Sequence, residues 1–414
     1  RISGGRLVEA NGTPFIMRGT SHAHVWYQSQ TSSFANIKSL GANTVRVVLS
    51  GGRWTPANGV ADVANIVTLC KNNKLICMLE NHDTTGYGEQ QNEWTLDRAV
   101  DYWISVQSAL TGQENYVLVN IGNEPYGNNN PSAWTSATTS TISRLRNAGF
   151  DHTLVVDAPN WGQDWQFVMR DSAQTVFNSD VDRNTLFSIH MYGVFDTAAE
   201  INDYLQSFQS RNLPLVVGEF GHNHSDGNPD EDTIMAQAVQ RGIGYLGWSW
   251  SGNGGGVEYL DQVTNFNVSQ LTPWGERLFN GANGIRATSV QATIYGTQTP
   301  SPTPSVSPSP SPSPSGTKVC TATYTKVGQW PGGFQGEVRV TAGSAAITSW
   351  RVIWSWANGQ SITQFWSANV SGSVVATNMS YNGSLGAGQS TTWGFLGSWN
   401  NSANTNPTPT CTAG

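Results

Sequence analysis

The chain has 414 residues, a length that predicts two or more domains. Charged residues make up 12% of it and the formal net charge is −7, so nothing points to nucleic acid or an anionic membrane surface as a partner. No apolar run approaches the roughly 18 residues that a membrane-spanning helix needs. The sequence starts at Arg1 without a methionine or a leader segment, which favours a mature secreted protein.

Short β-branched runs alternate with amphipathic stretches through the first part of the chain. The runs lie at 15–19, 44–49, 75–81, 116–122, 153–158, 185–190, 213–220 and 243–250. Helical periodicity is clear at 60–72, 94–110, 132–148, 196–211 and 231–241. Apolar strands separated by helices indicate a parallel sheet, and eight such units predict an α/β fold of the closed (β/α)8 barrel type. A doubly wound open sheet is the alternative, but no glycine-rich phosphate-binding turn follows the first run.

Polar and aromatic side chains stand at or near the ends of these predicted strands. In a barrel of this type, functional residues lie at the carboxyl ends of the strands. The residues at those ends are Arg46, His82, Asn123, Glu124, His190, Tyr192, Glu219 and Trp248. An apolar rim would not need so many hydrogen-bonding groups, so their clustering predicts a site.

Two glutamates of this set follow the fourth and the seventh predicted strands, Glu124 in IGNEP and Glu219 in VVGEFG. Either glutamate alone could as easily be an ordinary exposed carboxylate at a strand-to-helix turn as a catalytic one. As a pair across a barrel mouth they favour catalysis, because cleavage of a glycosidic bond needs one carboxyl to protonate the leaving oxygen and another to attack the anomeric carbon. Retention of configuration predicts carboxyl groups about 5–5.5 Å apart, and inversion about 6.5–9.5 Å.

An acidic stretch at 225–233 contains Asp230, Glu231 and Asp232. These carboxylates have the oxygen ligands that a structural Ca²⁺ ion prefers, although their spacing does not fit an EF-hand. The alternative is that they open a helix, where acidic residues are favoured as caps and by the helix dipole. No catalytic metal or other cofactor is required by the predicted chemistry.

A proline-serine segment divides the chain. Residues 299–316 read TPSPTPSVSPSPSPSPSG, which holds the backbone near polyproline II and offers no apolar face to bury. We therefore predict a barrel domain at 1–296, a linker at 297–317 and a module at 318–414. The last part has short alternating strands with Gly, Ser and Asn turns, which predict a β-sandwich with some of its tryptophans in the core.

The four cysteines form two local pairs, and no C-x2-C spacing suggests a metal site. Cys320 and Cys411 bracket the module, so a disulfide between them would tie its two ends together. Cys70 and Cys77 are expected to form a second disulfide, with a reduced pair in the barrel wall as the alternative.

The motifs NEP at 123–125 and GEF at 218–220 resemble those of glycoside hydrolase family 5. Longer stretches at 82–90, 157–165, 218–227 and 247–256 resemble its bacterial, actinobacterial-type endo-β-1,4-mannanases, over essentially residues 1–290. The resemblance implies a retaining enzyme with Glu124 as acid/base and Glu219 as nucleophile. The choice of mannan over cellulose comes from this resemblance alone, because the two sugars differ in the orientation of one hydroxyl.

The resemblance also implies roles for the other rim residues. Asn123 would contact the sugar 2-hydroxyl, and Arg46 and Tyr192 would hold the nucleophile ionised. His82 and His190 would line the cleaved bond, and Trp248 would be the platform beneath the sugar. Residues expected to line the rest of the cleft are His22, His24, Trp26 and Trp161.

The module resembles carbohydrate-binding module family 2, with its two cysteines in the terminal positions. Three exposed aromatic residues of that family stack on flat polysaccharide, and the matching positions are Trp330, Trp366 and Tyr381. The expected protein is a secreted monomer that hydrolyses mannan, glucomannan and galactomannan while bound to cellulose. A β-1,4-endoglucanase and a non-catalytic polysaccharide-binding protein are the alternatives.

Overall fold

The structure is a computed structural model that describes residues 1–296, 318–372, 375–379 and 382–414. It divides the chain into two compact units, Arg1–Ser301 and Pro302–Gly414. The predicted linker at 297–317 lies outside the described residues, so the two boundaries between the three predicted segments stay predictions. In the part of the chain that is described, no helix is both long and apolar enough to cross a lipid bilayer.

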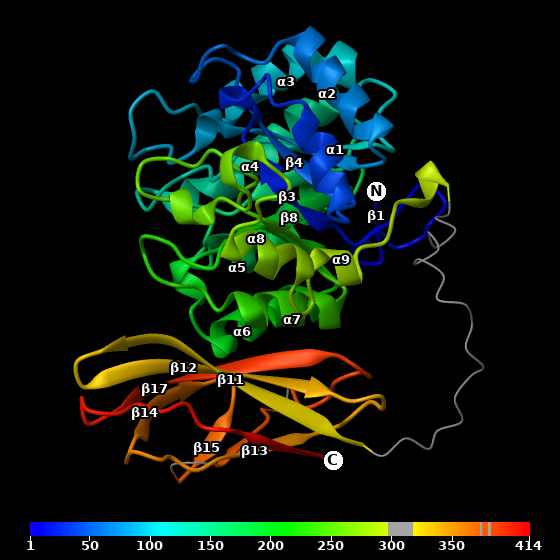
Figure 1. Cartoon of the computed structure of the whole chain (residues 1–414). Helices are drawn as coiled ribbons and strands as arrows, with labels where there is room; N and C mark the ends of the chain where they lie inside the picture. Colours follow the sequence, from blue (N-terminus) through cyan, green and yellow to red (C-terminus); the bar gives the residue numbers. More distant parts are fainter. Residues whose placement is uncertain (297–317, 373–374, 380–381) are drawn as a thin grey trace. The chain divides into compact units, whose positions relative to one another are not determined.

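The first unit contains a closed ring of eight parallel strands, which confirms the predicted (β/α)8 barrel (Figure 1). The strands are β3 (Arg18–His22), β4 (Thr44–Leu49), β5 (Ile76–Asn81), β6 (Val117–Asn120), β7 (Leu154–Asp157), β8 (Thr185–Met191), β9 (Leu215–Phe220) and β10 (Gly244–Gly247). Around the ring the order is β10-β3-β4-β5-β6-β7-β8-β9. Every residue of these strands is buried, because helices cover the outside and side chains fill the inside. A short hairpin of β1 (Ile2–Ser3) and β2 (Arg6–Leu7) precedes the ring.

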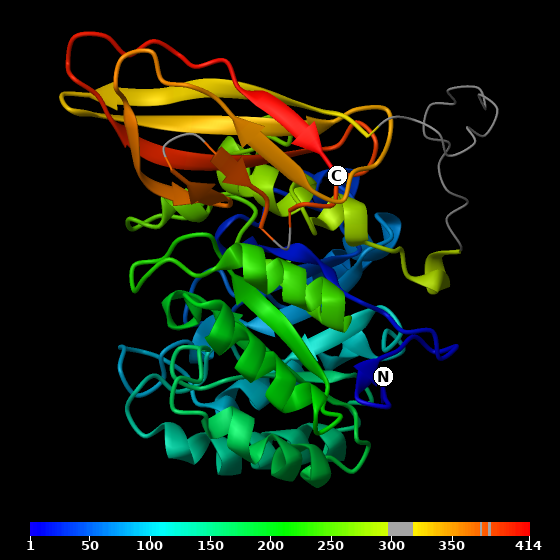
Figure 2. The same cartoon turned by 90° about the horizontal axis from the view of Figure 1, so that it is seen from below.

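The helices form an outer layer around the strands (Figure 2). They are α1 (Ser32–Ser39), α2 (Val60–Asn72), α3 (Leu96–Leu110), α4 (Trp134–Asn147), α5 (Val168–Ser179), α6 (Ala198–Gln209), α7 (Glu231–Arg241), α8 (Pro273–Asn280) and α9 (Ile285–Thr288). The helical stretches predicted from periodicity agree with α2, α3, α4, α6 and α7 to within two residues at each end. Each inward-facing apolar stripe packs on the barrel and forms one continuous core with it.

Threonine side chains fix where three of these helices begin. Thr95, Thr197 and Thr272 each accept a hydrogen bond from the backbone N–H three residues further on, at 3.1–3.4 Å. Such caps satisfy N–H groups that have no partner inside the helix. They therefore set the lengths of the preceding loops, which carry side chains of the candidate site.

The first strand was predicted at 15–19, and this is wrong by three residues, since β3 runs from Arg18 to His22. Phe15 and Met17 instead pack in a separate apolar cluster with residues from other strands, including Val155 and Leu246. Two polar side chains of the buried strand RGTSH are held by hydrogen bonds. The Arg18 guanidinium donates to Met17 O and Ile243 O and lies 4.3 Å from the centre of the Tyr245 ring, and the Thr20 hydroxyl donates to Gly247 O at 2.9 Å.

The second unit has two four-stranded sheets, which confirms the predicted β-sandwich. Its strands are β11 (Cys320–Trp330), β12 (Gly333–Ala342), β13 (Trp350–Ile353), β14 (Ser361–Trp366), β15 (Asn369–Ser371), β16 (Val375–Thr377), β17 (Ser390–Ser398) and β18 (Thr410–Ala413). One sheet has the order β11-β12-β17-β14 and the other β15-β16-β13-β18. Trp350 in β13 and Trp354, which directly follows that strand, are both buried in the core of the module, as expected for some of its tryptophans.

Both expected disulfides are present. Cys70 at the end of α2 is joined to Cys77 in β5, so a reduced pair is excluded in this structure. Cys320 in β11 is joined to Cys411 in β18, and the bond therefore links the two sheets of the sandwich as well as the ends of the module. Closing a loop of 91 residues is expected to stabilise the module by about 3–5 kcal/mol.

Candidate active site

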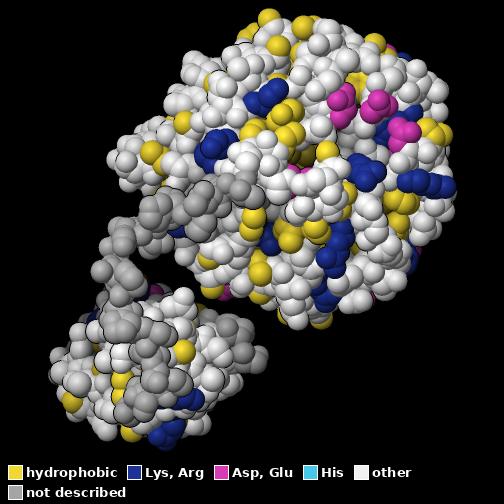
Figure 3. All heavy atoms as spheres, turned by 90° about the vertical axis from the view of Figure 1, so that its right-hand side faces the viewer, with side chains coloured by type: hydrophobic (Ala, Val, Ile, Leu, Met, Phe, Trp, Pro, Cys, Tyr) yellow, Lys and Arg dark blue, Asp and Glu magenta, His cyan; other side chains and the backbone are white. Residues whose placement is uncertain are grey.

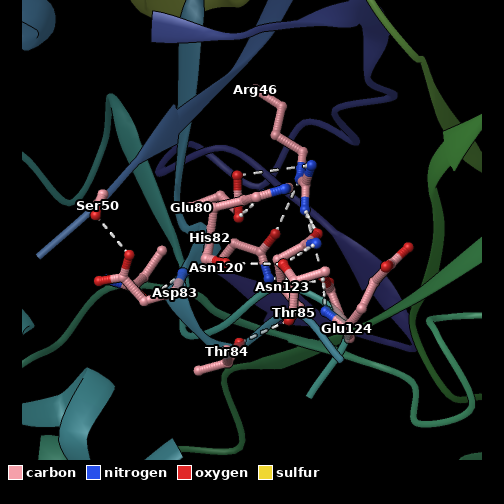
Figure 4. Close-up of polar contacts among 12 residues, drawn as sticks. Arg46, Ser50, Glu80, His82, Asp83, Thr84, Thr85, Asn120, Asn123 and Glu124 are labelled. Carbon is pink, nitrogen blue, oxygen red and sulfur yellow. Dashed lines mark hydrogen bonds and ion pairs between the residues drawn. The ribbon is translucent and has the colours of Figure 1, made fainter. Parts of the chain in front are cut away.

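The polar rim residues converge at the carboxyl ends of the barrel strands, as predicted. Arg46 lies within β4, His190 within β8 and Glu219 within β9, while Glu124 follows the end of β6. His190 and Glu219 occupy paired positions on neighbouring strands, next to an irregularity in the register between β8 and β9. Figure 4 shows side chains from β4, β5 and β6 pointing toward one another at this end of the barrel.

Arg46 is the centre of the hydrogen-bond network (Figure 4). Its side chain is fully buried and donates to Glu219 Oε1 at 2.6 Å, to Asn123 Oδ1 at 2.6 Å and to Asn120 Oδ1 at 3.0 Å. Asp157 lies 3.3 Å from the same guanidinium. Burial opposes its charge, but the surrounding carboxylates outweigh that penalty and raise the pKa of Arg46, so the guanidinium stays charged.

Glu219 is held by two donors. Besides Arg46, the Tyr192 hydroxyl donates to Glu219 Oε2 at 2.9 Å. Burial, together with the charges of Glu219 and Glu124, raises the pKa of Tyr192 well above its ordinary value, so this hydroxyl keeps its proton and remains a donor. The cation and the fixed donor together hold both oxygens of this carboxylate in place. Glu219 therefore has the surroundings that a carboxylate nucleophile needs.

Glu124 has a different environment. Its Oε1 lies 2.7 Å from His190 Nδ1, and its backbone has a φ of +40°, a left-handed value that is strained for a residue other than glycine. The Gly86 N–H donates to Glu124 O at 3.2 Å, and the Glu124 N–H donates to Asp157 Oδ2 at 3.4 Å. These contacts hold the strained backbone, which aims the carboxyl group at the same space as Glu219.

The carboxylates of Glu124 and Glu219 lie close together. One ligand atom from each of Glu124, His190 and Glu219 falls within 4.8 Å of the other two, the one such group in the described part of the chain. This upper bound on one oxygen from each residue is compatible with the carboxyl separation of about 5–5.5 Å that retention requires. The same atoms could in principle ligand a cation, but Arg46 already supplies a positive charge to Glu219 at 2.6 Å and opposes a second one.

His190 connects Glu124 to a further carboxylate. Its Nε2 forms an ion pair with Asp157 at 3.3 Å. Burial alone would lower the pKa of His190, but the charges of Glu219 and Asp157 raise it to about 10. Burial alone would raise the pKa of Asp157, but the nearby charges of His190 and, to a smaller extent, Arg46 lower it to about 2. The pair is therefore an imidazolium and a carboxylate at neutral pH.

The raised pKa of His190 predicts a pH dependence of stability. Its contribution should be fully present below the unfolded pKa of about 6.5 and lost as the pH rises toward 10. The difference in thermal unfolding temperature between the wild type and His190→Gln should therefore shrink by several degrees between pH 6 and pH 10, since each pKa unit is worth about 1.4 kcal/mol. A difference that stays constant would show that His190 is not protonated in the folded protein.

An aromatic wall stands beside these groups. The His82 ring is stacked on Trp248, with ring centres 5.8 Å apart, and contacts Trp26 at 5.4 Å and Trp54 at 5.3 Å. Glu80 orients it from behind, because Glu80 Oε1 lies 2.8 Å from His82 Nδ1. Burial opposes the charge on His82, but Glu80 raises the pKa of this imidazole. Trp248 and Trp26 thus lie where a sugar ring can stack.

Two residues expected to line the cleft do not. His22 and His24 are fully buried, so neither has accessible surface with which to contact a sugar. His22 is the last residue of β3 and packs edge-on against Phe34, while His24 is bonded to Asp62 at 3.0 Å. Both histidines lie at or just after the carboxyl end of β3, but neighbouring side chains cover them completely. Trp161 is partly exposed beside the site.

Sequence reasoning did not single out Glu80, Asp157 and Asn120, although all three contact the network. Asn120 Nδ2 donates to Asp157 Oδ1 at 2.9 Å, and both side chains are buried. A usable signal existed, because the predicted strands LICMLEN and TLVVDA each contain one acid near the carboxyl end. An unpaired buried carboxylate is expensive, so an acid inside an apolar strand indicates a charged partner nearby.

The acidic stretch after β9 lies at the start of helix α7, in agreement with the alternative prediction that these residues cap a helix. Asp230 is the N-cap of α7 and accepts from the Thr233 N–H at 3.0 Å. Asp232 lies 2.6 Å from the Arg277 guanidinium. These contacts account for two of the three carboxylates, and the calcium site predicted there stays a prediction.

The module exposes two of its three predicted binding aromatics. Trp330 is 45% and Trp366 43% exposed. Trp330 lies over Gly333 on β12 and Trp366 over Gly394 on β17, and a Cβ atom on either glycine would meet the indole at 2.2–2.4 Å. Both rings therefore rest on the sheet at positions without side chains. Tyr381 lies outside the described residues.

Comparison with known proteins finds two families. Residues 8–254 match the cellulase family, glycosyl hydrolase family 5, and residues 320–414 match the cellulose binding domain family. A mannan endo-1,4-β-mannosidase from Streptomyces lividans is 61% identical over 297 residues, which cover 71% of this chain and 77% of the relative. An enzyme of the same name from Cellvibrio japonicus is 54% identical over 297 residues, 71% of this chain and 69% of the relative.

A solved structure of a β-mannanase from Thermomonospora fusca matches with a TM-score of 0.70 and 63% sequence identity. The match covers 71% of this chain and 98% of that one.

Proposed function

The chain belongs to glycosyl hydrolase family 5, and on that premise we propose that it is a secreted endo-β-1,4-mannanase that retains configuration. The observation that carries the proposal is the pair of glutamates that have ligand oxygens within 4.8 Å of each other. Glu219 is held on both oxygens by Arg46 and Tyr192, which suits a nucleophile of fixed orientation, while Glu124 is bonded through one oxygen to His190, which suits a carboxyl that exchanges a proton with the leaving group.

In the first step, one oxygen of Glu219 attacks the anomeric carbon while Glu124 donates its proton to the glycosidic oxygen. The bond from the anomeric carbon to that oxygen breaks, and a bond to the Glu219 carboxylate forms. The leaving chain departs with the proton of Glu124. His190, 2.7 Å from Glu124 Oε1, then stabilises the carboxylate that remains.

In the second step, the Glu124 carboxylate takes a proton from a water molecule whose oxygen attacks the anomeric carbon. The bond to Glu219 breaks, and the sugar is released with its original configuration. Asn123, whose Oδ1 accepts from Arg46 and whose Nδ2 donates to Thr85 Oγ1 at 2.8 Å, has one amide N–H left for the sugar 2-hydroxyl. Trp248 supplies the stacking surface beneath the ring.

The relatives named mannan endo-1,4-β-mannosidase support mannan, glucomannan and galactomannan as substrates. On the face that Figure 3 draws, the Lys, Arg, Asp and Glu side chains form small separate groups among white and yellow atoms. The test is release of reducing sugar from galactomannan and from carboxymethyl cellulose, side by side, with Glu219→Ala as the blank. Release mainly from the cellulose derivative would make the protein an endoglucanase, and no release from either would make it a binding protein.

We propose that the C-terminal module binds cellulose through Trp330, Trp366 and Tyr381. Its match to the cellulose binding domain family supports this role, as do the two exposed indoles resting on one sheet. Flat aromatic faces stack on pyranose C–H groups. Mannan lies beside cellulose in plant walls, so binding of cellulose would raise the local concentration of substrate.

Trp366→Ala is expected to weaken adsorption to crystalline cellulose roughly tenfold, because one stacking contact is worth about 1 kcal/mol or more. Hydrolysis of soluble galactomannan should be unchanged. The matched control is Val327→Ala, which removes a 55% exposed side chain from a strand of the same sheet and should adsorb like the wild type. Equal adsorption of both variants would remove the role assigned to Trp366.

The two disulfides support secretion of the whole chain into an oxidising environment. We propose a monomer with domains at 1–296 and 318–414 and a linker at 297–317, which acts without a cofactor, nucleic acid or membrane. A structural calcium ion at Asp230, Glu231 and Asp232 would be seen as a metal-dependent rise in the unfolding temperature.

A further inference from the structure

A histidine that follows β9 packs against the tyrosine that contacts the proposed nucleophile. The centre of the His224 ring lies 4.4 Å from that of the Tyr192 ring, and the two planes are tilted by 30°. The Tyr192 hydroxyl in turn donates to Glu219 Oε2 at 2.9 Å. Because a phenol ring can pivot about its side-chain torsions, a neighbour packed on its face restricts where the hydroxyl lies. His224 is therefore placed to control this hydrogen bond.

Asp226 fixes the His224 ring. Asp226 Oδ1 lies 2.6 Å from His224 Nδ1. Burial alone would lower the pKa of His224, but the hydrogen bond and the charge of Asp226 raise it. Burial alone would raise the pKa of Asp226, but hydrogen bonds from His224 and then from Gln163 lower it. Both shifts favour an imidazolium paired with a carboxylate, so the folded protein favours a charge-assisted bond between the two side chains.

The same carboxylate joins three loops of the site. Asp226, which follows β9, accepts from the Gly193 N–H after β8 at 3.1 Å and from Gln163 Nε2 after β7 at 2.7 Å. Gln163 completes the connection, because its Oε1 accepts from the Val194 N–H at 3.1 Å. Gln163 is only 7% exposed, so water competes little for these bonds. Since Tyr192 directly precedes Gly193, the bonds also hold the backbone that carries the tyrosine.

Two glycines allow this close approach. A Cβ atom on Gly193 would meet the backbone and the side chain of Asp226 at 2.6 Å. Gly227 has a φ of +140°, which side chains disfavour, and a Cβ atom on it would lie 3.4 Å from the Cα atom of Gly193. The stretch 218–227 is therefore shaped to bring Asp226 against the end of β8, a feature that the two-glutamate mechanism does not use.

We propose that His224 and Asp226 position Tyr192, and that they thereby hold Glu219 in the orientation needed for attack on the anomeric carbon. The inference rests on the proposed role of Glu219 as nucleophile. Both residues act through Tyr192 and need not touch the sugar, so they are positioning residues. A carboxylate that is free to rotate is less often aligned for attack, so loss of these contacts should lower kcat and leave KM nearly unchanged.

The test is a double-mutant cycle on soluble galactomannan. His224→Ala should lower kcat roughly tenfold and change KM by less than about twofold, because it misaligns the nucleophile without removing a contact to the substrate. Tyr192→Phe, which removes the hydroxyl, should lower kcat roughly 10²-fold. In the Tyr192→Phe background, His224→Ala should lower kcat by less than about a further twofold, since its effect passes through that hydroxyl.

Asp226→Asn provides a second, independent cycle. Its amide has one acceptor oxygen in place of two, so it cannot keep the bonds to both His224 and Gln163. We expect kcat to fall several-fold in the wild type and to change little in the Tyr192→Phe background. His224→Phe should recover part of the kcat lost in His224→Ala, because it keeps a ring against Tyr192. Ser225→Ala, which changes the exposed residue between the two, is the matched control and should behave like the wild type.

Losses of kcat that multiply in the double variants would overturn the inference, because they would show that His224 and Asp226 act independently of Tyr192. A change in KM alone, or no change in either constant, would overturn it as well. Thermal unfolding of each variant checks that a loss of kcat does not come from unfolded protein. Failure of the wild type to hydrolyse galactomannan would instead overturn the proposed function.

Discussion

Glu219→Ala is expected to lower kcat on galactomannan by at least about 10³-fold, because removal of a nucleophile leaves only binding and electrostatic contributions to the rate. The variant should still fold, because the buried Arg46 guanidinium retains its ion pair with Asp157 and its hydrogen bonds to the side-chain oxygens of Asn120 and Asn123. Activity is measured as reducing-sugar release, with circular dichroism as a check on folding. Glu114→Ala, which removes an exposed glutamate before β6, is the matched control and should be fully active.

Azide distinguishes a lost nucleophile from a damaged site. In Glu219→Ala, azide can occupy the space of the missing carboxylate and attack the anomeric carbon of β-mannobiosyl fluoride. A carbon–nitrogen bond forms, fluoride leaves, and the product is the α-azide, of inverted configuration. Formation of a β-azide would show that azide arrives from the opposite face and that Glu219 is not the nucleophile.

The position of the two glutamates can be predicted from the alternation of apolar runs and helical stretches in the sequence. Glu124 and Glu219 could be placed at one rim because uninterrupted apolar runs identify parallel strands, and such strands all end at the same edge of a barrel. Six of the predicted strands overlap the observed ones to within two residues at each end. Residues that directly follow an uninterrupted apolar strand were therefore the easiest to place.

The first strand was misplaced because its core is polar. A search for apolar runs selects FIM at 15–17, whereas the strand itself is RGTSH, in which Arg18 and Thr20 bond to partners far away in the sequence. Partners of this kind cannot be read from local pattern. For Glu80 and Asp157 the local pattern signals a buried acid, but it does not identify the charged partners on other strands, which are Arg46 and His190.

Two strands of the module carry little apolar signal in the sequence. β11 and β18 are rich in threonine and exposed on alternate residues. Pairing of each to another strand, together with the disulfide between Cys320 and Cys411, defines them in the structure. Register between strands, rather than composition, is the information that the sequence alone does not supply.

Glu124→Ala is expected to separate the two steps of the reaction. Hydrolysis of mannohexaose should fall by about 10²–10⁴-fold, the usual contribution of a general acid or base, because a sugar alkoxide leaves poorly without a proton. β-Mannobiosyl fluoride needs no protonation, so its first step should remain fast while the second, which lacks its base, becomes slow. A burst of fluoride followed by a slow steady state, with a covalent sugar on Glu219 detectable by mass spectrometry, is the predicted result.

Azide gives the opposite outcome in this variant from that in Glu219→Ala. It needs no general base, so it should attack the sugar bound to Glu219 from the face that Glu124 once lined and release a β-azide. Glu258→Ala, which removes an exposed glutamate after β10, is the matched control and should show neither burst nor azide product. Because retention requires two displacements, opposite azide products from the two glutamate variants would assign both roles, and identical products would contradict the assignment.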